Sequence, residues 1–154
     1  MSLPVSTQTP LPIRQLILDA VGAALDAISG VQHVYRHREA VSDYDYPSLR
    51  IVDRGDSTER KVQHLHEARL QFEVWAHGRD WDREERRQDL AQLRTSVEIA
   101  LMNNDTWSGY AVQTNLTSAD EHQGEALDPD AFAVVIGEIV YRTELNNPYV
   151  VAEL

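Results

Sequence analysis

The sequence predicts a single α+β domain: a mainly antiparallel β-sheet with two α-helices packed on one face, in the order αβββαββ. Two amphipathic stretches predict the helices, and several runs of alternating apolar and polar residues predict the strands. The length of 154 residues, 42% of them hydrophobic, suits one domain with a substantial core. We expect this domain to span residues 12–145, with an N-terminal arm at residues 1–11 and a C-terminal tail at residues 146–154.

The first helix is predicted directly after the arm. Pro12 is tolerated near the first turn of a helix, and Gly30 is placed to end it. The apolar residues between them fall on one helical stripe: Ile13, Leu16, Ile17, Ala20, Val21, Ala24, Leu25 and Ile28. The arm itself contains two prolines and no period, so we expect it to lie outside the core.

Two strands are predicted next, at residues 31–38 and 48–53. Pro47 favours extended geometry at the residue before it, directly ahead of the second strand. The segment from Asp53 to Gln63 is polar and contains a glycine, which predicts a protruding loop between strands. Loops of this length tend to be functional or mobile.

A longer strand and the second helix follow in succession. In the strand, Leu70, Phe72, Val74 and Ala76 alternate with Arg69, Gln71, Glu73 and Trp75, so one face is expected to be buried. Asp82 and Glu85 have the spacing of a capping box at the start of a helix. Beyond them, apolar residues recur at three- and four-residue steps: Leu90, Leu93, Val97 and Leu101.

The last third of the chain predicts two more strands. The first spans Tyr110 to Thr117, and an acidic exposed loop is expected from Ser118 to Asp130. The second, at residues 131–145, is apolar on both faces around Val134 to Ile136, which is typical of a strand that is central or covered on both sides. In the tail, Tyr149, Val150 and Val151 are apolar enough to pair with a neighbour.

Composition excludes some classes of function. A formal charge of −11 with a single lysine, Lys61, is opposite to the surplus of cations with which proteins grip nucleic acid. Such acidity suits either solubility or a lumen through which DNA slides without sticking. Asp19 interrupts the only candidate signal sequence and no membrane-length apolar run occurs, so we expect a soluble protein made in the cytoplasm. The chain has no cysteine, which excludes disulfides and thiolate chemistry.

The residues that could carry chemistry are better explained without it. His64 and His66 lie near Glu67 but lack a third metal ligand, and the carboxylates Asp43, Asp45 and Asp53 lack the pattern of a calcium loop. Neighbouring Glu84 and Glu85 suit the start of a helix. No phosphate-binding glycine loop or serine-nucleophile motif occurs. We therefore expect no enzymatic activity, no cofactor and no metal.

The three tryptophans allow two interpretations. Trp75, Trp81 and Trp107 could form an aromatic binding platform. Alternatively, Trp75, which lies on the polar register of its strand, is buried at a subunit contact, where tryptophan is favoured. Under the second interpretation Trp75→Ala should yield soluble monomer.

The order of these segments resembles the tail-terminator and related tail-completion proteins of long-tailed bacteriophages. The segments that carry the resemblance are an opening helix that ends in Ile28-Ser29-Gly30-Val31, the segment Tyr46-Pro47-Ser48-Leu49-Arg50-Ile51, the long strand from Leu70 to Trp75, the second helix and two closing strands. The resemblance covers roughly residues 12 to 145. The long acidic second loop and the tail that contains Tyr149 depart from it.

The resemblance implies a structural virion protein that assembles in the host cytoplasm. Such proteins form a ring, usually of six copies, that caps the head-proximal end of the tail tube, stops tube polymerisation and offers a surface to head-completion or neck proteins. DNA passes the lumen without specific binding, and no membrane is involved. The candidate interface residues are Arg54, Asp56, Glu59, Arg60, Lys61, Trp75, Glu121, Glu125 and Tyr149.

Two alternatives stay open. A neck or head-completion (connector) protein is the near alternative within the same class. A small ligand-binding or enzyme-accessory α+β domain is the alternative of another class. A closed ring with two chemically different faces would favour the structural class, and a monomer with a concave apolar pocket would favour the other.

Overall fold

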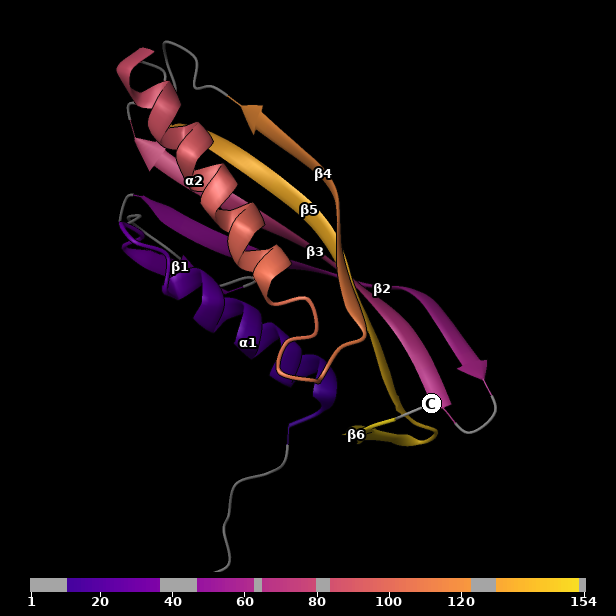
Figure 1. Cartoon of the computed structure of the whole chain (residues 1–154). Helices are drawn as coiled ribbons and strands as arrows, with labels where there is room; N and C mark the ends of the chain where they lie inside the picture. Colours follow the sequence, from indigo (N-terminus) through magenta and orange to yellow (C-terminus); the bar gives the residue numbers. More distant parts are fainter. Residues whose placement is uncertain (1–10, 37–46, 63–64, 80–83, 123–129, 153–154) are drawn as a thin grey trace, which may run out of the picture.

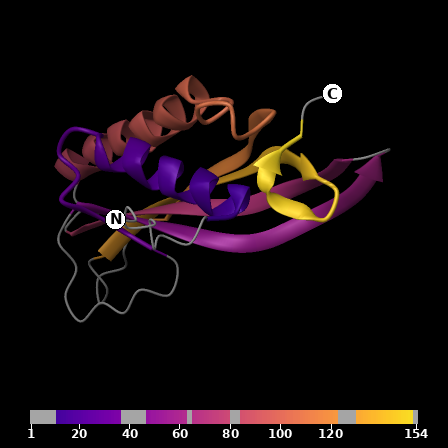
Figure 2. The same ribbon diagram turned by 90° about the horizontal axis from the view of Figure 1, so that it is seen from below.

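The computed structural model describes residues 11–36, 47–62, 65–79, 84–122 and 130–152. Their order is α1 (Ile13–Asp26), β1 (His33–Tyr35), β2 (Ser48–Val62), β3 (Leu65–Arg79), α2 (Glu84–Asn103), β4 (Gln113–His122), β5 (Asp130–Glu144) and β6 (Asn147–Val151). Both helices lie on the same face of one sheet (Figures 1 and 2). The predicted α+β class and element order are confirmed, with β6 as an added last strand.

The sheet has the strand order β1-β2-β3-β5-β4, and β6 pairs with the end of β5. Only the short β1–β2 pair is parallel. β3 and β5 pair along their whole length, from Leu65 opposite Glu144 to Arg79 opposite Asp130. The prediction that the strand at residues 131–145 is central is therefore confirmed.

The first helix ends earlier than its apolar stripe indicated. α1 stops at Asp26, and Ile28 belongs to the turn that follows, where Val31 N donates to Ile28 O. Gly30 has φ +89° in this turn, a conformation that L side chains rarely adopt. Gly30 therefore shapes the turn after the helix and does not cap it directly.

The core lies between the helices and one face of the sheet. It takes Ile17 and Leu25 from α1, Leu90 and Val97 from α2, and the apolar register of β3. The fully buried strand residues opposite the helices include Leu49, Leu70, Phe72, Val74 and Ile139. The helices are thus held by burial of one apolar face, as the periodicities predicted.

One glycine in β5 is required by this packing. Gly137 lies opposite Phe72, and a Cβ at Gly137 would come within 2.9 Å of Phe72 Cζ and 3.0 Å of Asn115 O. The phenyl ring thus fills the space that a side chain would take. Phe72 compensates for the missing side chain at the centre of the sheet.

The prediction of a loop from Asp53 to Gln63 is wrong for the residues up to Val62, which form a strand. Residues 54–62 continue β2 and pair with β3, so that Val62 lies opposite Leu65. Two register shifts, between Asp53 and Gly55 and between Asp56 and Glu59, interrupt the alternation. A polar strand with bulges has no apolar period, which is why its sequence was typical of a loop.

The acidic loop predicted at residues 118–130 is also shorter than expected. β4 continues through His122, with Glu121 opposite Ala133, and β5 begins at Asp130. The tail does form a strand, but β6 pairs with β5 of the same chain. Ala152 N also donates to Arg142 O.

α2 begins at Glu84 within the described residues, and the predicted capping residue Asp82 lies outside them. The connection from α2 to β4 is built around Trp107, which is 2% exposed and donates its Nε1–H to Thr114 Oγ1 at 2.8 Å. Trp107 and Ser108 both have positive φ. Neither described helix is long and apolar enough to cross a membrane.

Candidate functional site: the edges and the open face of the sheet

The sheet presents two long edges. β1 pairs only with Ser48, Leu49 and Arg50, so from Ile51 onward β2 has no second strand among the described residues. β4 pairs with β5 on one side, and within the same described ranges nothing pairs with its other side. We call residues 51–62 the β2 edge and residues 113–122 the β4 edge. Unpaired backbone donors and acceptors on such edges are templates for pairing with another strand.

A bulge lies in each of these edges. In the β2 edge the first of the two register shifts falls at Arg54, and Gly55 adopts φ +84°. In the β4 edge the shift falls at Thr117, whose hydroxyl donates to Ile136 O at 3.2 Å. Bulges bend and twist a strand locally and recur at sheet edges.

The β2 edge is tied to α1 by an ion-pair network beneath the helix. Arg14 donates to both carboxylate oxygens of Asp53, at 2.5 and 2.6 Å, and to Asp56 at 3.2 Å. Tyr141 donates to the second oxygen of Asp56 at 3.1 Å. These carboxylates raise the pKa of Arg14, chiefly through the hydrogen bonds that Arg14 donates to Asp53.

This network corrects the interpretation of Asp53 as part of a solvated loop. Because the bulge at Arg54 shifts the register, Asp53 and Asp56 both lie on the helix-covered face. Asp56, a predicted interface residue, is bonded within its own chain to Arg14 and Tyr141. The network fixes the course of the β2 edge.

The face of the sheet opposite the helices, which we call the open face, carries three ion pairs. Figure 2 shows that no helix covers this side. The pairs are Arg54 Nη2 to Glu73 Oε2 at 2.6 Å, Arg69 Nη1 to Glu138 Oε1 at 3.0 Å, and Arg142 Nε to Glu67 Oε2 at 2.7 Å. The register explains two of them: Glu67 lies directly opposite Arg142, and Arg69 is a diagonal neighbour of Glu138, which lies opposite Gln71.

Glu138 joins three strands on the open face. Besides Arg69, it accepts from Gln71 Nε2 on β3 at 3.1 Å and from Asn115 Nδ2 on β4 at 3.4 Å. The Gln71 hydrogen bond lowers the pKa of Glu138 most, Asn115 and Arg69 lower it further, and desolvation partly opposes them. The carboxylate is therefore charged at neutral pH.

Trp75 lies on the open face one strand inside the β2 edge, between Arg50 on β2 and Val134 on β5. It is half-buried, donates its Nε1–H to Glu73 Oε2 at 3.1 Å and stacks on His77 with ring centroids 6.2 Å apart. Glu73 thus connects two predicted interface residues, Arg54 and Trp75.

The other predicted interface residues are not brought together. The backbone of Glu59, Arg60 and Lys61 belongs to the β2 edge, and that of Glu121 to the β4 edge; their side chains lie outside the described part. Glu125 is outside the described residues altogether. Tyr149 lies on β6 and is 47% exposed.

The described residues do not form the aromatic platform or the metal site that the sequence analysis considered. Trp107 is buried, so it cannot share a surface platform with Trp75, and Trp81 is outside the described residues. Glu67 is bound by Arg142, and His64 is not described. Among the described residues no group of three or more His, Asp or Glu is placed to hold a metal ion.

One cavity of about 240 Å³ lies between α1 and β2. Its walls are mixed in polarity: Gln15, Leu18, Asp19, Arg36, Ile51 and Asp53. Asp53 is bound by Arg14 there, and Arg36 donates to Leu18 O. The cavity is therefore not the concave apolar pocket that the ligand-binding alternative expects.

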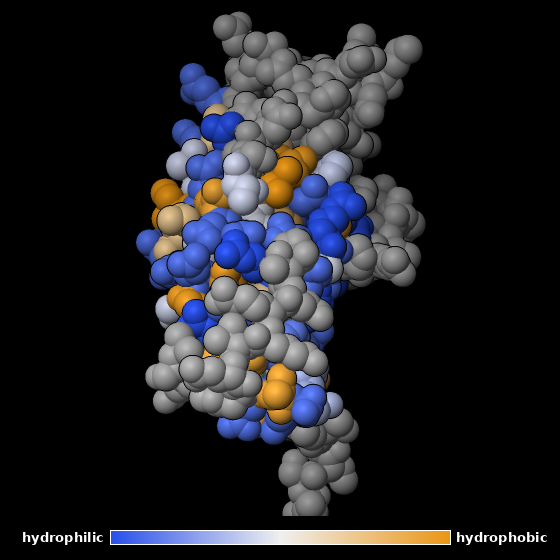
Figure 3. Space-filling view, turned by 90° about the vertical axis from the view of Figure 1, so that its right-hand side faces the viewer, coloured by the Kyte–Doolittle hydropathy of each residue, from blue (hydrophilic) through white to orange (hydrophobic). Residues whose placement is uncertain are grey.

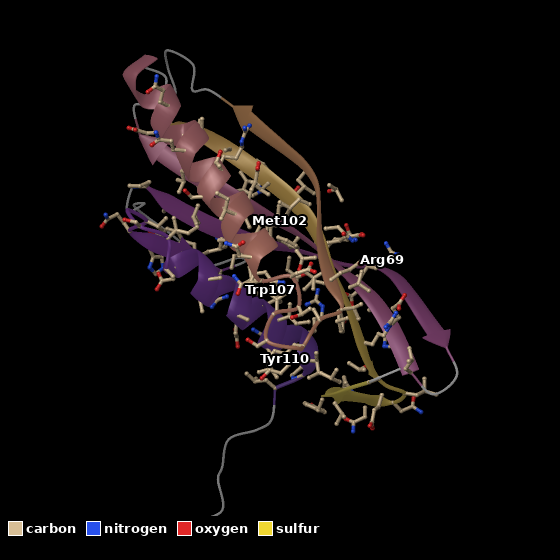
Figure 4. The ribbon with its side chains drawn as sticks, viewed as in Figure 1. Arg69, Met102, Trp107 and Tyr110 are labelled. Carbon is tan, nitrogen blue, oxygen red and sulfur yellow. The ribbon has the colours of Figure 1, made fainter. Side chains whose placement is uncertain are left out.

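The exposed large apolar residues gather at one end of the molecule. They are Leu11, Ile99, Met102, Val112, Tyr149 and Val150. α1 begins, α2 ends and β6 lies at this end, which we call the apolar end (Figure 1). In Figure 4, Met102, Trp107 and Tyr110 follow one another from α2 into the loop at this end, whereas Arg69 lies away from them on β3. On the one face that Figure 3 shows, the described residues are polar in most places and apolar in separate groups.

The sequence did not reveal the residues that organise the open face. The sequence predicts Glu73 only as one of the polar positions that alternate along its strand, and it singles out neither Glu138 nor Arg14. Their partners are distant in the chain: Arg69 and Glu138 are 69 residues apart. Opposite charges on matching registers of two strands are the only sequence signal that could have found them.

This chain is similar to known proteins in structure and not in sequence. No protein-family model and no curated protein matches the sequence. A chain of the "Virion of native gene transfer agent (GTA) particle" is similar in structure, with a TM-score of 0.47 and 17% sequence identity over 84% of this chain and 91% of that chain.

Proposed function

We propose that this chain is a structural virion protein, a tail terminator that forms a ring at the head-proximal end of the phage tail tube. The ring stops tube polymerisation and provides the docking surface for the neck. The support is the resemblance over residues 12 to 145 together with a fold that has the element order of the resemblance. A neck or head-completion protein is the near alternative.

The observation that carries the proposal is the pair of edges. β2, β3, β5 and β4 are four strands that alternate in direction, so the β2 and β4 edges run antiparallel to each other. The β4 edge of one copy therefore matches the β2 edge of the next in an antiparallel pair. Repetition of one such head-to-tail contact closes a ring when the rotation between copies allows it.

The helix layer favours one way of closing this ring. Both helices occupy the same face of the sheet, and each helix with its side chains is about 10 Å across. The outer circumference of a ring is longer than the inner one, so the helices fit outside and the open face lines the hole. The apolar end then becomes one rim of the ring and suits an axial contact with the tube or the neck.

In this proposal the protein acts by assembly and catalyses no reaction. Its partners are further copies of itself, the tail tube protein and a head-completion protein, and its place is the virion. The ligand-binding alternative would place the function in a pocket of a monomer.

The experiment is to mix purified protein with growing tail tubes of the same virus and to locate its density by electron microscopy. The proposal expects one ring at one end of each tube and tubes that stop lengthening. A matched variant, Met102→Asp with Val112→Asp, alters only the apolar end and should still form rings at high concentration but no longer cap tubes.

Two outcomes would redirect the proposal. Density elsewhere in the neck of the virion would favour the head-completion alternative. A monomer that neither binds tubes nor forms rings would favour the small-domain alternative.

A further inference from the structure

The open face carries more positive charge than the rest of this acidic chain leads one to expect. Four of the arginines whose side chains the structure describes lie there: Arg50, Arg54, Arg69 and Arg142. The described glutamates of the same face number four: Glu67, Glu73 and Glu138 in the ion pairs, and Glu144 at the end of β5. The chain as a whole has a net charge of −11. A surface of alternating Arg and Glu thus lies within a strongly acidic molecule.

The two signs of charge lie at different depths. In the Arg54–Glu73 pair the arginine side chain is 54% exposed and the glutamate 15%, and in the Arg69–Glu138 pair the values are 43% and 15%. Arg142 and Glu67 follow the same order, at 22% and 13%. Anything that approaches this face meets guanidinium groups first and carboxylates beneath them.

Arginine is the side chain best suited to phosphate, because its planar fork donates two parallel hydrogen bonds. On this face the guanidinium groups of Arg54, Arg69 and Arg142 each already donate to a carboxylate beneath them. Arg50 is engaged differently, over the Tyr35 ring at 5.5 Å and to Arg36 O at 3.0 Å. A phosphate would have to displace one of these carboxylates before it could bind Arg54, Arg69 or Arg142, and Glu73 and Glu138 are each held by further donors.

We propose that the open face is the surface this chain turns toward duplex DNA, and that Glu67, Glu73 and Glu138 hold its arginines so that DNA slides past without being captured. The assignment rests on the proposed ring, in which the open face lines the hole. The paired face is nearly neutral, so it neither binds a phosphate backbone nor repels it as strongly as the rest of the chain would.

At neutral pH the glutamates are suited to holding the arginines of the open face. Hydrogen bonds, from Gln71 first, lower the pKa of Glu138, so the carboxylate nearest the centre of the face stays charged. Glu73 accepts from both Nε and Nη2 of Arg54 and from Trp75 as well. Glu73 and Glu138 are thus held by further donors of the sheet and not by an arginine alone.

The test releases the arginines without adding any cation. The triple variant Glu67→Gln, Glu73→Gln, Glu138→Gln is compared with the wild type for binding to a fluorescently labelled duplex, by anisotropy over a series of salt concentrations. We expect no measurable binding by the wild type and at least a tenfold increase in affinity for the variant. The slope of log K against log salt should approach −3, at about −0.9 for each phosphate contact.

The matched control removes the same number of negative charges elsewhere. Asp19→Asn and Asp26→Asn lie on α1 and Asp89→Asn lies on α2, on the helix side of the sheet and away from the three ion pairs. This variant should bind DNA no better than the wild type. Equal binding by both triple variants would reduce the effect to net charge and overturn the assignment to the open face.

A second pair of variants covers the case in which the triple variant is poorly folded. Glu73→Gln alone should bind weakly with a salt slope near −1, and adding Arg54→Gln should abolish that binding. DNA binding by the wild type, or none by either Glu→Gln variant in folded form, would contradict the proposal. The assay uses dispersed protein, so its failure is distinct from a failure to form rings.

Discussion

The two faces of the same sheet are stabilised by different interactions. The face under the helices buries an apolar register in which Leu70, Phe72 and Val74 are each at most 1% exposed. The open face is held by hydrogen-bonded ion pairs around Glu67, Glu73 and Glu138. Burial stabilises the fold through area removed from water, whereas exposed ion pairs contribute little each and fix geometry instead.

Because of this difference, substitutions on the two faces should have different effects. Substitutions on the covered face should unfold the domain, because cavities and lost burial cost several kcal/mol. Substitutions on the open face should leave a folded protein with altered surface properties. A face that tolerates substitutions without unfolding the domain is one on which a protein can change its contacts with partners.

The largest effect is expected at Trp107 on the covered side. Trp107→Ala removes a fully buried indole and its hydrogen bond to Thr114, so unfolding should become easier by about 3–5 kcal/mol. Trp75→Ala, on the open face, is the matched control and should cost about 1 kcal/mol because Trp75 is only half-buried. Urea denaturation of both variants measures the contrast, and equal losses would contradict it.

An intermediate effect is expected at Arg14, which connects the two regions. Arg14→Gln leaves Asp53 and Asp56 without their cation beneath α1 and should cost about 1–3 kcal/mol. The comparison is Arg54→Gln, whose arginine is 54% exposed and which should cost less than about 1 kcal/mol. A larger loss for Arg54→Gln in thermal unfolding would mean that the open face carries the stability.

The smallest effect is a pH dependence at Glu138. Its folded-state pKa lies below the ordinary value of 4.5, so its contribution is present above that value and is lost as pH falls through the folded pKa. The difference in unfolding free energy between the wild type and Glu138→Gln should be constant near neutral pH and shrink below pH 4.5. Denaturant titrations at several acidic pH values measure it, and a difference that grows with acid would have the wrong sign.

The covered face was largely predictable from the sequence. The stripe from Ile13 to Leu25, the apolar steps from Leu90 to Leu101 and the alternation from Leu70 to Ala76 each placed an element and its buried side correctly. Local periodicity suffices there because burial repeats with the period of the element.

The open face and the edges were not predictable in the same way. Residues 54–62 and 118–122 are strands whose polar side chains and bulges give no period, so they were expected to be loops. The ion pairs depend on partners such as Arg142 and Glu67, 75 residues apart. The register that brings them together is set by the covered face, and no local pattern contains it.

The central claim, that the β4 edge of one copy pairs with the β2 edge of the next, can be tested by cross-linking because the chain has no cysteine. Arg54→Cys with Thr117→Cys places one thiol on each edge, and a short bis-maleimide is applied to concentrated protein and to protein bound at tube ends. Arg54→Cys with Thr95→Cys, on the exposed side of α2, is the control.

The account predicts a ladder of covalent oligomers that ends at one fixed size for the edge pair and is missing for the control. Single-cysteine variants should stop at dimers. No ladder from the edge pair in either sample, or an equal ladder from the control, would contradict edge-to-edge assembly.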